Sequence, residues 1–181
     1  MKLVLKNVRI SYPKLVEPVS FNGSEPKYEV NLLIPKTDTA TVEAVNAAIV
    51  GAIEADLKRG AKSVLKTPVK PLPTLLKDGD DKPDPSQNGH WILTAKTKDA
   101  PKLVTTTHEI VTGDAIRETF YGGRYVSASL YIAPYNMGRK GVAARLQALL
   151  DSGEGEPFGG GARTIEDLFD LDTDDILNSF E

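Results

Sequence analysis

The chain has 181 residues, of which 40% are hydrophobic and 26% are charged, as is typical of a soluble globular domain with appendages. No apolar run approaches the roughly 18 residues of a membrane-spanning helix, and Lys6 and Asn7 stand where a signal peptide needs its apolar stretch. The lack of cysteine excludes disulfides and thiolate chemistry.

Charge divides the chain into two parts. Residues 1–150 carry 21 basic and 15 acidic residues, a net charge of +6, whereas residues 151–181 carry one basic and ten acidic residues, a net charge of −9. The formal total of −3 hides this asymmetry. A basic body with an acidic tail suggests binding of an anionic partner, which an evenly acidic protein would not.

The first half of the chain predicts two strands and one helix. Residues 3–12 are rich in β-forming side chains, and Pro13 is expected to end that strand. Apolar residues at every second position predict another strand over 28–34, stopped by Pro35. Asp38 or Thr39 then caps a helix whose apolar stripe runs from Val42 to Leu57, with Gly60 as its stop.

The second half predicts a long loop and then more strands. Residues 61–89 hold five of the twelve prolines and are expected to have little regular structure. Alternating patterns predict strands over 91–98, 102–107 and 125–135. Residues 141–150 fit a strand or a helix. Five or six strands with one principal helix, without regular βαβ alternation, favour a mainly β, mostly antiparallel barrel or sandwich.

Signs of catalysis or metal binding are weak. The sequence contains no phosphate-binding loop, nucleophile elbow or dinucleotide fingerprint. The acidic cluster over 78–84 lacks the spacing of an EF-hand and fits a solvated loop better than a cation site. His90 and His108 lack evident catalytic partners. We therefore expect no enzyme activity, cofactor or metal.

Aromatic and basic residues alternate on the predicted strands, as single-stranded nucleic acid requires for base stacking and phosphate contacts. Tyrosine is also a common half-buried strand residue, so each ring taken alone has a purely structural explanation. The stacking candidates are Trp91, Tyr121, Tyr125 and Tyr131. The phosphate-binding candidates are Lys96, Lys98, Arg124, Arg139 and Lys140.

The C-terminal end predicts a glycine-rich linker over 151–162 and an acidic tail over 163–181. One interpretation of the tail is a short helix docked on the body through Ile165, Leu168 and Phe169, with Thr164 and Asp167 as its cap. The other is a tail that contacts partners or the protein's own basic groove. The residues expected to anchor a partner are Asp174, Asp175, Ile176, Leu177 and Phe180.

Five stretches, in order along the chain, resemble the phage and prophage family of OB-fold single-stranded DNA-binding proteins. They are residues 27–36, 76–80, 120–129, 135–142 (Tyr135-Asn136 with Lys140-Gly141-Val142) and 155–160. The resemblance implies an OB barrel over residues 1–150, a strand over 141–150, and binding of single strands without sequence preference during phage replication or recombination. The tail resembles the acidic tip by which bacterial single-stranded DNA-binding proteins recruit replication and repair partners, except that Glu181 follows Phe180.

The sequence thus predicts a protein of the bacterial host's cytoplasm that coats single-stranded DNA, with no membrane contact. Replication or recombination proteins are further expected partners through the tail, and self-association is left open. One alternative is an RNA-binding OB module, since stacking and phosphate contacts do not distinguish the sugar. Another is a phage protein-interaction or inhibitor protein whose acidic tail mimics DNA.

Overall fold

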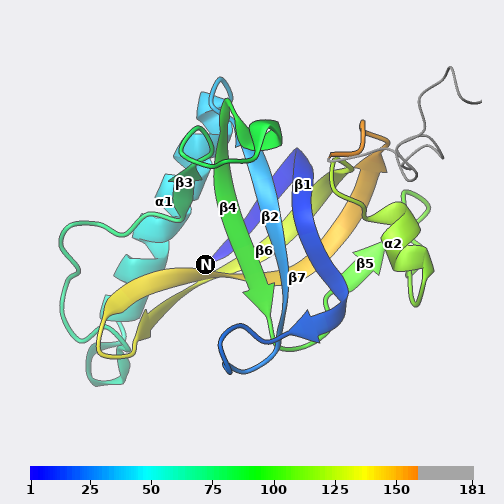
Figure 1. The fold of residues 1–181 in the computed structure, drawn as a ribbon. Helices are drawn as coiled ribbons and strands as arrows, with labels where there is room; N and C mark the ends of the chain where they lie inside the picture. Colours follow the sequence, from blue (N-terminus) through cyan, green and yellow to red (C-terminus); the bar gives the residue numbers. More distant parts are fainter. Residues whose placement is uncertain (159–181) are drawn as a thin grey trace, which may run out of the picture.

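The computed structural model describes residues 1–158, and their core is a barrel of five strands (Figure 1). The strands are β1 (Lys2–Val19), β2 (Lys27–Pro35), β3 (Leu76–Asp78), β4 (His90–Thr97), β5 (Lys102–Val104), β6 (Tyr125–Asn136) and β7 (Lys140–Gly153). Antiparallel pairs follow the order β4-β2-β1-β6-β7, and a short parallel pairing of β4 with β7 closes the ring. The short β3 and β5 add to β4 and β7 outside this ring. The predicted mainly antiparallel barrel is confirmed.

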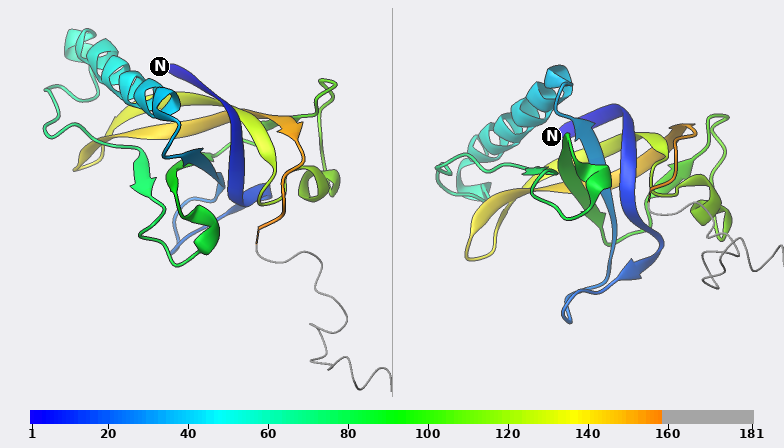
Figure 2. Two further views of the ribbon diagram at one scale, coloured as in Figure 1. Left: turned by 90° about the horizontal axis from the view of Figure 1, so that it is seen from above. Right: turned by 45° about the horizontal axis from the view of Figure 1, so that its top comes forward.

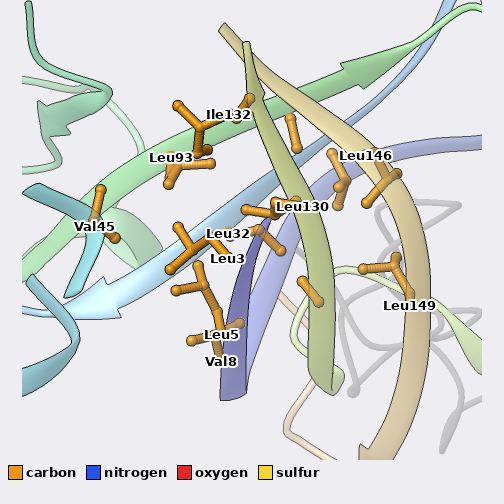
Figure 3. Packing of buried hydrophobic residues seen from close by; sticks show 14 of the residues in the cluster. Leu3, Leu5, Val8, Leu32, Val45, Leu93, Leu130, Ile132, Leu146 and Leu149 are labelled. Atoms are coloured by element: carbon orange, nitrogen blue, oxygen red, sulfur yellow. The ribbon is translucent and has the colours of Figure 1, made fainter. Parts of the chain in front are cut away.

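The barrel interior holds side chains from every one of the five strands (Figure 3). Leu5, Leu32, Leu93, Leu130 and Leu149 are each at most 1% exposed and come from β1, β2, β4, β6 and β7. Removing apolar surface from water stabilises such a core by about 25 cal/mol per Å². The core therefore fixes which face of each strand points outward.

Helix α1 (Thr39–Leu57) lies against β1 and β6 at one end of the barrel (Figure 2). The Asp38 side chain accepts a hydrogen bond from the Thr41 backbone N–H at 3.1 Å, which confirms the predicted N-cap. The helix buries one face, formed by Val45, Ala48, Ile49, Ala52, Ile53 and Asp56. Among the described residues, no helix is both long and apolar enough to cross a bilayer.

The expectation that Pro13 ends the first strand was wrong, because β1 continues to Val19. The pairing with β2 shifts register between Ser11 and Lys14, which places Pro13 in a bulge. A proline is tolerated there because its missing N–H falls where the ladder is already interrupted. Tyr12, in the same bulge, has a left-handed backbone with φ of 47°.

Residues 140–153 form a strand, as the family resemblance implied. Between Leu146 and Ala148, β7 has one residue more than its partner β6, which leaves Gln147 as a bulge. The bulge moves the buried positions from 142, 144 and 146 to 149 and 151. This change of phase produced the apolar spacing that also fits a helix.

Three other expectations needed adjustment. The segment 61–89 contains β3 and a short 3-10 helix at Pro85–Gln87, with another at Gly60–Lys62 beside it. The strand expected over 102–107 ends at Val104, and the short helix α2 (Ala115–Thr119) was not foreseen. The body also extends past the expected boundary at residue 150, because β7 runs to Gly153 and the Phe158 N–H donates to the Gly122 carbonyl at 2.9 Å.

Candidate nucleic-acid interface

A groove of about 960 Å³ crosses the outer face of β2 and β4. The edge of β4 opposite β2 pairs with β3 near Trp91 and with β7 at Ala95 and Lys96, so the sheet forks along that edge. The β3 loop and the β6–β7 hairpin border the fork on its two sides (Figure 1). Apolar side chains form part of the groove lining, namely Leu75, Ile92, Ala133, Val142 and Ala143.

Basic side chains outnumber acidic ones in this groove. The basic residues are Lys27, Lys77, Lys82, Lys96, Lys98 and Arg145, and the acidic ones are Glu29 and Asp99. Lys96 pairs with Glu29 at 2.7 Å, and Lys98 pairs with Glu25 at 2.6 Å. The other four basic side chains form no ion pair with any of residues 1–158. The groove is therefore suited to an anionic ligand.

Two tyrosines supply aromatic rings to the groove. Tyr12 is 57% exposed, and its hydroxyl donates to Asp84 Oδ2 at 2.6 Å. Asp84 raises the pKa of Tyr12 through this hydrogen bond, and Tyr12 lowers the pKa of Asp84. Tyr135 is 37% exposed and lies over its cross-strand partner Gly141, where a Cβ atom would stand 2.6 Å from the tyrosine hydroxyl oxygen. Both rings thus line the same groove as the four cations that form no ion pair within residues 1–158.

The hairpin that carries Tyr135 is held at its tip by the loop after α1. Asn136 Nδ2 donates to the Val64 carbonyl at 3.3 Å, and the Lys140 ammonium donates to Thr67 Oγ1. This loop is itself fixed by the buried Asp56 carboxylate, which accepts the backbone N–H groups of residues 64 and 65 at 3.0 and 2.9 Å. Helix α1 therefore positions one side of the groove through polar contacts.

The loop on the other side of the groove is anchored through Lys36. Its ammonium lies 2.6 Å from carboxylate oxygens of both Asp78 and Asp80, and 4.9 Å from the centre of the Trp91 ring. Trp91 packs against the core and lies outside the groove lining. Trp91 thus lies beside the cation that anchors this loop, and its stacking role stays a prediction. Lys36 pairs with two carboxylates of the acidic cluster, Asp78 and Asp80.

Three other expected binding residues lie at the opposite end of β6. They are Tyr121, Arg124 and Tyr125, and the backbone of residues 154–158 crosses this end next to the two tyrosines. Tyr121 donates from its hydroxyl to the Gly155 carbonyl at 2.9 Å. Arg9 lies over the rings of Tyr125 and Phe158, at 5.4 and 4.1 Å from their centroids. Gly155 is required at this crossing, because a Cβ atom would stand 2.0 Å from the Gly123 carbonyl oxygen.

Arg124 is engaged within the body and is not available as the expected surface cation. Its Nε and Nη2 atoms donate to the two oxygens of Asp151 at 2.7 and 2.6 Å, and the side chains are 14% and 7% exposed. This bidentate contact raises the pKa of Arg124 and, with the Gly153 N–H, holds the pKa of Asp151 below its usual range. The pair fastens the end of β7 to the start of β6.

Of the nine candidates from the sequence, the structure places Lys96 and Lys98 in the groove. Tyr131 is 42% exposed on the outside of β6, where its backbone partner on β7 is Arg145, a groove residue. Arg139 and Lys140 lie at the turn of the β6–β7 hairpin. The tail residues Asp174, Asp175, Ile176, Leu177 and Phe180 lie outside the described residues.

Sequence reasoning missed Tyr12, Tyr135, Lys27 and Arg145 as groove residues. Tyr12 enters the groove from a bulge, which no periodic pattern predicts. Arg145 was hidden by the strand or helix ambiguity, because only a strand places it next to Lys96. Tyr135 was within a family-like motif, and that was the one available signal.

The family model described as Enterobacter phage Enc34, ssDNA-binding protein, matches residues 1–177. The chain belongs to this family. A curated relative, putative protein p50 of Acyrthosiphon pisum secondary endosymbiont phage 1, is 32% identical over 178 residues and covers 94% of both chains.

Solved structures agree with this family assignment. The single-stranded DNA-binding protein of bacteriophage Enc34, in complex with ssDNA, has a TM-score of 0.75 and 29% identity over 87% of this chain and 89% of its own. The gp2.5 single-stranded DNA-binding protein of bacteriophage T7 has a TM-score of 0.58 over 91% of this chain and 97% of its own. At 16% identity, T7 gp2.5 supports the fold alone. The barrel is thus the OB fold that the resemblance to phage single-stranded DNA-binding proteins implied.

The Asp151–Arg124 pair generates a prediction about stability and pH. Asp151→Asn should lower the free energy of unfolding by about 3 kcal/mol at pH 7, because it leaves a nearly buried guanidinium without its counter-charge. Since the folded-state pKa lies below the ordinary 3.8, the wild type should lose this stabilisation as pH falls below 3.8 and through the folded value. Urea unfolding of both proteins across pH measures the difference between their free energies of unfolding, which should narrow as pH falls.

Glu154→Gln is the matched control, because Glu154 lies 4.0 Å from the same arginine but is 89% exposed. It should leave stability nearly unchanged. Equal losses in the two variants would contradict a specific role for the buried pair.

Proposed function

We propose that this protein binds single-stranded DNA without sequence preference, and that it does so in phage DNA replication and recombination. The observation that carries the proposal is the place of the groove, on the second and third strands of the barrel in chain order. That face is the one with which OB folds bind oligonucleotides. Binding involves no catalytic step, and the site of action is the cytoplasm of the bacterial host.

The chemistry of the groove supports a single strand as the ligand. An apolar floor with Tyr12 and Tyr135 offers surface for unpaired bases, and the basic residues around it offer contacts for phosphates. We assign phosphate contacts to Lys96, Lys98 and Arg145, with Arg139 and Lys140 extending the path along the hairpin. Tyr131 remains a candidate beside Arg145. The Enc34 relative was solved in complex with ssDNA, which supports the same ligand.

The first prediction from this function concerns ligand class and salt. Binding to a single-stranded oligonucleotide should exceed binding to a duplex of equal length, because only unpaired bases expose their faces for stacking. Affinity should fall with salt at a log–log slope of roughly −0.7 per phosphate neutralised. Titrations with matched single-stranded DNA, duplex and RNA measure this. Stronger RNA binding would favour the RNA module, and no binding at micromolar protein would favour the protein-interaction alternative.

The second prediction separates stacking from structural tyrosines. Tyr12→Ala and Tyr135→Ala should each weaken single-strand binding by about 1–3 kcal/mol while the protein stays folded. Tyr125→Ala, which removes a ring packed on Arg9, should lower the melting temperature and leave the affinity of the folded fraction unchanged. Tyr12→Phe keeps the ring and removes its hydrogen bond to Asp84, so it shows which of the two contributes to binding. Loss of affinity in Tyr125→Ala alone would move the binding site to the other end of β6.

We also propose that the acidic tail, residues 163–181, competes with DNA and recruits replication or recombination proteins. The proposal rests on charge, because residues 163–181 carry one basic and seven acidic residues, a net charge of −6, next to a body (residues 1–158) with a net charge of +3. A tethered competitor acts at an effective concentration on the order of millimolar. Asp174 and Asp175 would contact basic surfaces, and Ile176, Leu177 and Phe180 would anchor the partner.

The third prediction tests this tail. Truncation after Gly161 should raise single-strand affinity at low salt, and the gain should shrink at high salt because salt screens the attraction between tail and groove. Partner capture should be lost in the same variant. Unchanged affinity at low salt would exclude competition, and an unfolded truncated body would support the docked helix.

A further inference from the structure

One carboxylate lies within the row of cations that crosses the groove. On β2, Glu29 directs Oε2 to the Lys96 ammonium at 2.7 Å and Oε1 to the Lys14 ammonium at 3.9 Å. The Glu29 side chain is 24% exposed, compared with 58% for Glu25, the partner of Lys98. Glu29 is therefore the more enclosed of the two carboxylates that pair with groove lysines.

The strand register fixes this arrangement. Lys14, Glu29, Lys96 and Arg145 are successive backbone partners across β1, β2, β4 and β7. Side chains at paired positions point to the same face of a sheet. A ligand on this outer face thus meets Glu29 between two lysines, with Lys96 already occupied.

We propose that Glu29 is a specificity-determining residue, which occupies Lys96 and so weakens ligands that bind through phosphates alone. The inference rests on the proposed single-strand function and deepens it. A phosphate can take Lys96 only by displacing the Glu29 carboxylate, which then repels it. A single strand is flexible and also contacts the apolar floor and the tyrosines through its bases. It can therefore place its phosphates at Arg145, which forms no ion pair within residues 1–158, and leave the Glu29–Lys96 pair in place. This spares it part of the cost. A duplex, with its bases paired, lacks these contacts and bears the full cost.

The test is Glu29→Gln in the full chain, with single-stranded and duplex oligonucleotides of equal length at low salt. Two unit charges 4 Å apart in water change an equilibrium by a factor of about five. Duplex affinity should therefore rise about fivefold. Single-strand affinity should rise by less than half of that factor. The ratio of the two dissociation constants should fall accordingly, and the duplex salt slope should steepen by roughly 0.9 for one added phosphate contact.

Glu54→Gln is the matched control for net charge, because Glu54 is exposed on α1 and forms no ion pair with any of residues 1–158. It should leave the ratio of the single-strand and duplex dissociation constants unchanged. Glu29→Gln in a Lys96→Gln background should lose the duplex gain, since the proposed effect acts through Lys96. Thermal unfolding of each variant confirms that the compared proteins are folded.

Three outcomes would overturn the inference: an unchanged ratio in Glu29→Gln, the same change in Glu54→Gln, or a gain that persists without Lys96. Failure of the proposed function looks different. In that case the wild type would show no preference for single strands, and Lys96→Gln would leave binding unaffected. If Lys96→Gln weakens binding while Glu29→Gln leaves the ratio unchanged, the groove function stands and only the role of Glu29 is wrong.

Discussion

The short parallel contact between β4 and β7 is the constraint on which both the barrel and the groove depend. Ala95 and Ala144, 0% and 4% exposed, are partners at this contact. Their small side chains point into the core, so the next pair, Lys96 and Arg145, points outward. The contact that closes the hydrophobic core thus brings two cations together on the surface. Toward Trp91, β4 pairs with β3 and no longer with β7. The groove on β2 and β4 opens at this fork between β3 and β7.

Aromatic and basic residues form two separate clusters with different physical roles. At one end of β6, Arg9 and Arg124 make contacts within the body. Arg9 holds residues 154–158 through Phe158, and Arg124 holds the end of β7 through Asp151. In the groove, most of the cations have no carboxylate partner among the described residues. Residue type alone did not separate a structural from a binding arginine. The separation came from Asp151, whose burial beside Arg124 depends on the bulge in β7.

Much of the fold was predictable from sequence because its signals are local. The capped helix and the alternation in β2, β4 and β6 involve neighbouring residues, and each was assigned correctly. The wrong end of the first strand and the ambiguity over 141–150 both arise where one residue changes the period, at Tyr12 in β1 and at Gln147 in β7. The site was predictable only in part. Lys96 and Lys98 stand two positions apart at the end of β4, where an alternating pattern finds both, whereas Tyr12 and Arg145 reach the groove through pairings that are remote in sequence.

The two walls of the groove are joined to the barrel differently from its floor. The floor belongs to the closed sheet, but the walls are a hairpin held by Asn136 and Lys140 and a loop held by Lys36 and Tyr12. These polar attachments can change without opening the hydrophobic core. Evolution can therefore adjust the width of the channel at low cost in stability, by exchanging a few side chains such as Thr67 or Asp84.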